Sequence, residues 1–118
     1  MLSKPYEQIV PRLEREALER ALGMEGGYVL NFSDRTFDDF FFETVNIDTS
    51  ASSTFFNGRG TSKAKRLRSF IEKAQPHLVG KVLHELWEYR DAEAFYAAPA
   101  ADEKTRTLYF SAVARFEG

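Results

Sequence analysis

Apolar side chains recur at steps of three and four residues in five stretches of the chain, a spacing typical of amphipathic helices. The first stretch runs from Pro5 to Leu22, and Pro11 predicts a break near Val10 because proline lacks an amide hydrogen and crowds the preceding turn. The other four begin at Ser33 or Thr36, at Thr61 or Ser62, at Pro76 and near Asp102. The pattern therefore predicts a mostly α fold, a compact bundle of about five helices.

Two connections interrupt this helical pattern. Tyr28 to Phe32 follows the turn signal Gly26-Gly27 and has apolar residues at alternate positions, which predicts one short extended segment. Residues 46–61 are rich in Ser, Thr, Asn and Gly, and a connection of this length is usually functional or mobile. We expect Phe55 and Phe56 to pin its middle to the core.

The composition is that of one folded domain. The 118 residues are 43% hydrophobic and 29% charged, as in globular proteins, and they are enough for one hydrophobic core. The eleven Phe residues predict a core or an interface built on aromatic rings. The last helical pattern is still running at Gly118, so we expect residues 1–118 to be the N-terminal module of a longer protein.

Several partners and compartments are disfavoured. The chain has no stretch of about 18 apolar residues and no apolar run typical of a secretion signal, so we expect a cytoplasmic protein without a membrane partner. The absence of cysteine excludes disulfides and thiolate chemistry. The net charge of -2 gives no global attraction to nucleic acid, so such binding requires a local patch.

A local cluster of positive charge does exist. Over residues 59–73, six basic side chains stand against Glu72 alone, a net charge of +5. A helical wheel places Lys65, Arg66 and Lys73 opposite the apolar stripe, which fits either a solvated helix face or a salt-sensitive nucleic-acid contact. We call residues 59–68 the basic segment, and its candidate binding residues are Arg59, Gly60, Thr61, Ser62, Lys63, Lys65, Arg66 and Arg68.

The start of the basic segment, GRGTSK, superficially resembles a nucleotide-binding loop. A Walker loop needs the spacing G-x-x-x-x-G-K-[ST] after a buried strand, and neither is present, so we exclude a P-loop nucleotidase. Glycines and a helix amino terminus at Thr61, Ser62 and Lys63 still fit a looser anion site. Ordinary helix capping explains the same residues.

An acidic patch precedes the basic segment and consists of Asp34, Asp38, Asp39 and Glu43. If the patch and the basic segment are exposed on different sides, identical molecules could associate head to tail. The alternative is pairing between neighbouring helices of one chain.

We find no catalytic or metal-binding motif. His77, His84 and Glu88 have a spacing that approximates metal ligands, but a wheel places them opposite the apolar stripe, and HELWE lacks the second histidine of a HExxH site. Neither a G-x-S-x-G elbow nor the Arg-His pairing of HEPN-type ribonucleases occurs. We therefore expect no cofactor, no metal site and no enzymatic activity of this chain alone.

Three runs carry a resemblance to a known family: GYVLNFSDRTFDDFF at 27–41, GTSKAKRLRSFIE at 60–72 and HLVGKVLHELWEY at 77–89. They make residues 23–91 similar to an N-terminal helical domain of bacterial abortive-infection (AbiJ-like) and related phage-defence proteins. The matching positions of the aromatic first motif and the basic second motif are Tyr28, Phe32, Phe37, Gly60, Ser62, Lys63 and Arg66. In that family the domain precedes varied effectors, which implies a sensing, regulatory or assembly role without catalytic residues.

The resulting hypothesis is a non-catalytic recognition or assembly module of a bacterial anti-phage defence protein. Its partner would be another protein or a second copy of the chain. One alternative is a small nucleic-acid-binding domain that uses the basic segment. Another is an enzyme fragment whose catalytic part lies beyond Gly118.

Overall fold

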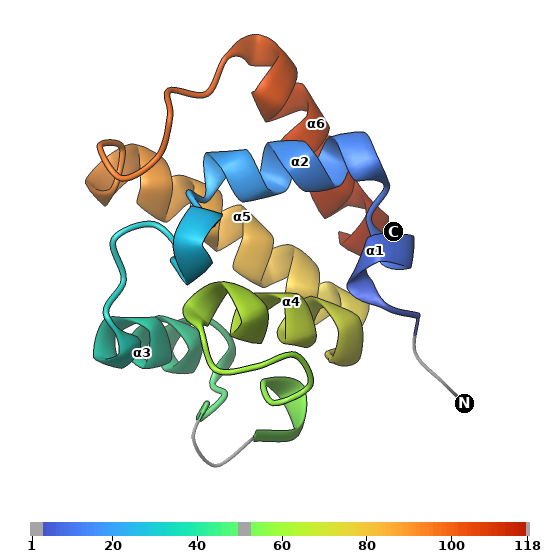
Figure 1. Ribbon diagram of the computed structural model, residues 1–118, viewed down its shortest axis with the longest axis vertical. Helices are drawn as coiled ribbons and strands as arrows, with labels where there is room; N and C mark the ends of the chain where they lie inside the picture. The colour runs from blue at the N-terminus through green and yellow to red at the C-terminus, as the bar shows by residue number, and fades with distance from the viewer. Residues whose placement is uncertain (1–3, 50–52, 118) are drawn as a thin grey trace.

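The computed structural model describes residues 4–49 and 53–117, and within them the chain forms six α-helices and two short 3-10 helices, η1 and η2 (Figure 1). In chain order these are α1 (Tyr6–Ile9), α2 (Arg12–Ala21), η1 (Glu25–Gly27), α3 (Asp34–Val45), η2 (Ser53–Phe55), α4 (Lys63–Lys73), α5 (Pro76–Glu93) and α6 (Glu103–Glu117). The predicted mostly α bundle is confirmed.

The break predicted near Val10 is also confirmed. α1 ends at Ile9, Val10 is extended with φ -112° and ψ 114°, and Pro11 is the N-cap residue of α2. Tyr6 and Val10 are both fully buried, and α1 packs against α4. The kink therefore lets one short amphipathic stretch cover two different parts of the molecule.

Serine side chains cap α3 and α4. Ser33 Oγ accepts the Thr36 amide at 3.1 Å, and Thr36 Oγ1 accepts the Ser33 amide at 2.8 Å, a reciprocal capping box. Ser62 Oγ accepts the Lys65 amide at 3.2 Å. Of the alternatives that the sequence left open, Ser33 and Ser62 are the caps.

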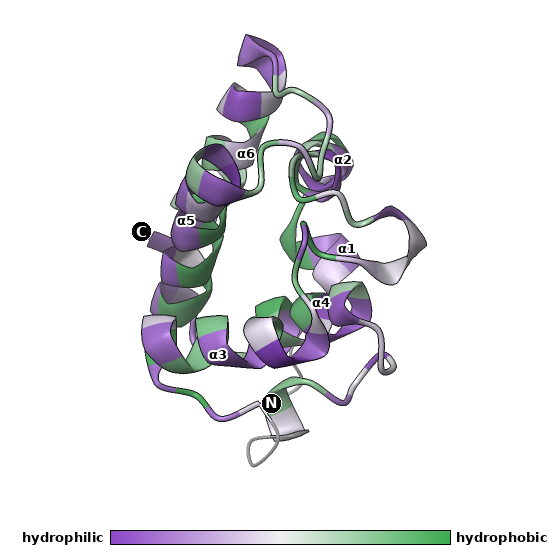
Figure 2. Ribbon diagram, turned by 90° about the vertical axis from the view of Figure 1, so that its left-hand side faces the viewer, coloured by the Kyte–Doolittle hydropathy of each residue, from purple (hydrophilic) through white to green (hydrophobic). Residues whose placement is uncertain are grey.

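α5 lies at the centre of the bundle and contacts α3, α4 and α6, while α2 packs on α6 (Figure 1). Figure 2 shows the hydrophobic faces of α4 and α5 turned toward the interior and their hydrophilic faces turned outward. α2 and α6, the first and last of the long helices, thus pack together and close one side of the fold.

Aromatic rings make up much of the core. The ring centroids of Phe37, Phe56 and Phe70 lie 4.9, 5.1 and 5.0 Å from that of Phe41. These rings come from α3, the 46–61 connection and α4, and all four residues are at most 3% exposed. Burial of one such ring stabilises a fold by about 1.5–3 kcal/mol, so this cluster is a main source of stability.

The Tyr28 to Phe32 segment is not a continuous extended strand. Tyr28 has ψ 164°, but Leu30 adopts a left-handed φ of 49° and donates its amide to the Leu22 carbonyl at 2.8 Å. Val29 and Leu30 are consequently both buried, whereas Tyr28 is 59% exposed. The alternating pattern therefore does not produce a strand with two faces.

The connection between α3 and α4 is anchored over its described part; residues 50–52 lie outside the described residues. The rings of Phe55 and Phe56 lie 6.3 and 5.6 Å from that of Phe70, which confirms the expected pinning. The Gly58 amide donates to the buried Ser69 hydroxyl at 3.2 Å. The described part of this connection is thus packed against α4.

Candidate functional site

Arg59, the first cation of the basic segment, joins three segments of the fold. Its Nε donates to Glu72 Oε2 at 2.8 Å and its Nη1 to Glu7 Oε2 at 2.9 Å. These contacts connect α1 to α4, and the hydrogen bonds from Arg59 lower the pKa of Glu7 below its usual value. The guanidinium also lies 5.7 Å from the Tyr6 ring centroid. Arg59 therefore has a structural role, because it holds α1 against α4.

Arg66 is likewise committed within the chain. Its Nη2 donates to Asp38 Oδ1 at 3.0 Å, and its guanidinium lies 5.1 Å from the Phe37 ring and 5.7 Å from the Phe56 ring. The wheel that placed Arg66 in solvent was wrong, because the side chain is only 17% exposed. A wheel shows only the helix's own apolar stripe and contains nothing about Phe37 and Asp38 of α3, which contact the Arg66 side chain.

Lys63 makes the second contact with the acidic patch. Its Nζ lies 3.7 Å from Asp34 Oδ1 and 5.5 Å from the Tyr28 ring centroid. Pairing within one chain therefore accounts for Asp34 and Asp38. The other two members of the patch are exposed: Asp39 has a 4.0 Å pair with Arg35, and Glu43 has no ion pair among the described residues.

Arg68 is the fourth cation of the basic segment that pairs with a carboxylate of the same chain. Its Nε and Nη2 donate to the two carboxylate oxygens of Glu19 at 3.2 and 3.1 Å, and the Tyr6 hydroxyl donates to the same carboxylate at 2.8 Å. α4 is thereby connected to α2. Burial and the neighbouring Glu19 carboxylate raise the pKa of Tyr6, so its hydroxyl remains a donor.

Lys65 differs from these four residues. Its side chain is exposed and forms no ion pair with any described residue. Gly60, with φ 136°, lies close beside it, since a Cβ at Gly60 would be 2.7 Å from Lys65 Cδ. Of the cations in the basic segment, Lys65 is the one available to a ligand.

The structure places six of the eight predicted site residues in two pockets, and Arg59 and Lys63 line neither of these. The larger, of about 560 Å³, lies between α2, η1 and the start of α4, and we call it the α2–α4 pocket. The smaller, of about 330 Å³, lies between α3 and the 46–61 connection. The larger pocket is lined by Glu19, Arg20, Gly23, Met24, Glu25, Gly26, Gly27, Ser62, Lys65, Arg68 and Pro99. The smaller is lined by Asp34, Thr49, Phe56, Asn57, Gly60, Thr61 and Arg66.

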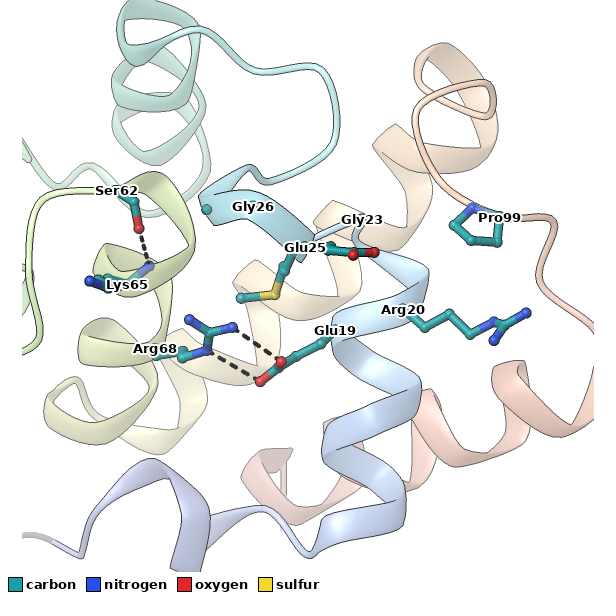
Figure 3. Close-up of a pocket in the computed structure, with 11 residues that line it drawn as sticks. Glu19, Arg20, Gly23, Glu25, Gly26, Ser62, Lys65, Arg68 and Pro99 are labelled. Atoms are coloured by element: carbon teal, nitrogen blue, oxygen red, sulfur yellow. Dashed lines mark hydrogen bonds and ion pairs between the residues drawn. The ribbon is translucent and has the colours of Figure 1, made fainter.

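Glycines form a close-packed wall of the α2–α4 pocket. Gly27 has φ 91°, and a Cβ there would lie 3.0 Å from Ser62 Cβ, so the backbone of η1 directly contacts the cap of α4. Figure 3 shows Lys65 beside Ser62 on one side of the pocket, Arg20 near Pro99 on the other, and the Arg68–Glu19 pair between them. Arg20 and the glycine wall were not predicted, because only the fold brings residues 20–27 beside α4.

Two exposed aromatic residues lie in the connection between α5 and α6. Phe95 is 65% exposed and Tyr96 70% exposed, and their rings meet edge to face with centroids 5.8 Å apart. We call them the aromatic pair. Two large aromatic residues followed by a run of small residues were the signal that could have identified them.

His77 and His84 are exposed, as the wheel predicted, and they line a shallow pocket of about 350 Å³ with Lys81 and Glu117. Within the described residues, no group of three or more His, Asp or Glu side chains is arranged to hold a metal ion. In the same part of the chain, no helix is long and apolar enough to cross a membrane.

Comparison with known proteins finds no protein-family profile, no curated protein and no solved structure that matches the chain.

Proposed function

We propose that this domain is a non-catalytic recognition or assembly module that docks a protein through the aromatic pair. The observation that carries the proposal is that Phe95 and Tyr96, both more than half exposed, are held next to each other on an anchored connection. Aromatic side chains are enriched at protein interfaces because they bury a large area with few rotatable bonds. Such a pair can act as the central anchor of an interface.

Hydrogen bonds fix Tyr96 in place. Asn31 Nδ2 donates to the Tyr96 hydroxyl at 2.8 Å, and Asn31 Oδ1 accepts the Tyr89 hydroxyl at 2.9 Å. Tyr89 is in turn stacked on Phe32, with ring centroids 4.6 Å apart. The surface is thus ordered before a partner arrives, which reduces the entropy lost on binding.

Arg90 fixes the connection from the other side. Its side chain is 5% exposed, and it donates to the Ala21 carbonyl at 2.8 Å, the Pro99 carbonyl at 2.5 Å and Asp91 Oδ1 at 3.1 Å. The aromatic pair therefore lies between two anchors, Asn31 and Pro99.

The charges favour this surface over direct pairing of the acidic patch with the basic segment. Arg59, Arg66 and Arg68 are 17–24% exposed and already hold carboxylates. A partner would have to break those pairs, and the gain from exposed ion pairs is small. The same commitments reduce the support for nucleic-acid binding by the basic segment.

The setting of this role is suggested by the sequence. The resemblance of residues 23–91 to abortive-infection domains suggests a bacterial anti-phage setting.

The test compares the double variant Phe95→Ser/Tyr96→Ser with Phe42→Ser, which removes a ring that is 58% exposed on α3. Sedimentation velocity of each protein over a range of concentrations measures self-association. We expect the wild type and Phe42→Ser to associate and the double variant to remain monomeric.

A photo-crosslinking residue at position 96, or at position 42 as the control, extends the test to other partners in bacterial cells. A partner crosslinked at position 96 is then purified, and its affinity is measured against both variants. A monomeric wild type with no more crosslinking at position 96 than at position 42 contradicts the proposal. Association that persists in the double variant contradicts it as well.

A further inference from the structure

We infer that the α2–α4 pocket binds a small phosphorylated anion. Neither residue of the aromatic pair lines this pocket. Anion binding in the pocket therefore does not depend on protein docking at the aromatic pair.

Two exposed cations from different helices flank this pocket. Arg20 belongs to α2 and Lys65 to α4, and neither forms a salt bridge within 4.0 Å among the described residues. After the hydrogen bonds from Thr105, the charge of Arg20 also helps to lower the pKa of Asp102, which does not line the pocket. Figure 3 places the two cations on opposite sides of the pocket. Long exposed cationic side chains can reorient toward an anion without breaking a salt bridge.

Arg68 adds a fixed donor between them. It uses Nε and Nη2 on Glu19, so its Nη1 group makes no hydrogen bond to a described residue. A guanidinium carries five N–H donors and can hold Glu19 while also donating to a phosphate oxygen. The pair with Glu19 keeps this donor in position.

The backbone wall lets an anion approach closely. Gly26 and Gly27 have φ values of 78° and 91°, and both line the pocket without a side chain. They face the start of α4, an eleven-residue helix whose amino-terminal dipole favours negative charge. Met24 adds an apolar surface for the rest of the ligand.

The negative side chains of the pocket define the size and charge of the ligand. Glu19 is neutralised by Arg68, which leaves Arg20 and Lys65 against the exposed Glu25, a net charge of +1. The volume of about 560 Å³ falls in the range of sites for small organic ligands. A pyrophosphate or a nucleoside diphosphate therefore fits better than a long polyanion.

The test is isothermal titration calorimetry of the full chain with inorganic pyrophosphate and with ADP. We expect Arg20→Met and Lys65→Met each to weaken binding about tenfold, as loss of a charged hydrogen bond does. Lys73→Met is the matched control, because Lys73 is also exposed on α4 but does not line the pocket. Glu25→Gln should tighten pyrophosphate binding, because it removes a like charge.

Thermal unfolding of each variant checks that the fold is kept, which we expect since all three cations are exposed. Tighter binding of ADP than of pyrophosphate assigns the site to a phosphate ester, and the reverse assigns it to free phosphate; both support an anion site. No binding of either probe by the wild type overturns the inference. Equal losses in Lys73→Met and Lys65→Met overturn it too, because they indicate attraction to α4 as a whole.

Discussion

The Arg66 guanidinium lies between the rings of Phe37 and Phe56 and bonds Asp38. Its loss removes two cation–π contacts and an ion pair from a site that is 17% exposed. We predict that Arg66→Ala lowers the free energy of unfolding by about 1–3 kcal/mol, whereas Lys65→Ala changes it by less than about 0.5 kcal/mol. Urea denaturation measures both values. Equal effects of the two substitutions would show that Arg66 is an ordinary surface residue.

Glu14 makes stability depend on pH. Its carboxylate accepts Arg115 Nε at 2.6 Å, Arg115 Nη2 at 2.9 Å and the Ser111 hydroxyl at 3.0 Å. The hydrogen bonds from Arg115, the largest cause, lower the pKa of Glu14 below the usual 4.5. A lowered folded-state pKa means that the stabilisation is complete above the unfolded-state pKa and is lost as the pH falls through the folded-state pKa.

We therefore predict that Glu14→Gln is less stable than the wild type at pH 7, by about 1–3 kcal/mol. The difference should shrink as the pH falls below about 4, because the wild-type carboxylate then becomes protonated. Urea denaturation at a series of pH values measures this. Glu16→Gln, an exposed change on the same helix, is the control. A difference for Glu14→Gln that stays constant down to pH 2 contradicts the assignment.

At the scale of elements, α1 depends on its contacts with α4. A helix of four residues is not stable in isolation, and α1 is held by Arg59 bridging Glu7 and Glu72 and by the Tyr6 amide donating to Glu72 Oε2 at 2.8 Å. We predict that Arg59→Gln increases amide hydrogen exchange in α1 at least several-fold and leaves α5 unchanged. Arg12→Gln, an exposed substitution at the start of α2, should have no such effect. Unchanged exchange in α1 would show that apolar burial of Tyr6 alone is enough to hold α1 in its helical conformation.

The elements that could be predicted are those whose signal is local. The caps, the break before Pro11 and the apolar stripes depend on residues within a few positions of one another. Pairing of Arg66 with the acidic patch was one of two alternatives that the sequence left open, and it could not be selected because Asp38 lies 28 residues away. The pairing of Arg68 with Glu19, 49 residues away, was not predicted. The same holds for the α2–α4 pocket, which exists only after α2, η1 and α4 have packed.

For the whole molecule, closure of the fold depends on helices outside residues 23–91. α6 packs on both α2 and α5, and the buried Tyr109 hydroxyl donates to the Leu83 carbonyl. Glu14 of α2 holds Arg115 of α6 across the same contact. Arg90 of α5 also bonds the last carbonyl of α2, that of Ala21. α6 thus covers α5 and packs on α2, and Arg90 of α5 caps the carboxyl end of α2.

We therefore predict that a fragment of residues 23–91 does not fold cooperatively. Without α2 and α6, the fragment exposes Trp87, which is 4% exposed in the intact bundle and packs on Tyr109 and Phe110 with ring centroids 4.8 and 5.3 Å away. It also leaves the Arg90 guanidinium without the Ala21 carbonyl. Circular dichroism should show no sharp thermal transition for the fragment, and its amide spectrum should be poorly dispersed. Residues 4–117, which keep every described helix, are the control and should melt like the full chain. A cooperative transition of the 23–91 fragment would mean that α3, α4 and α5 form an independent core and that α2 and α6 are additions to it.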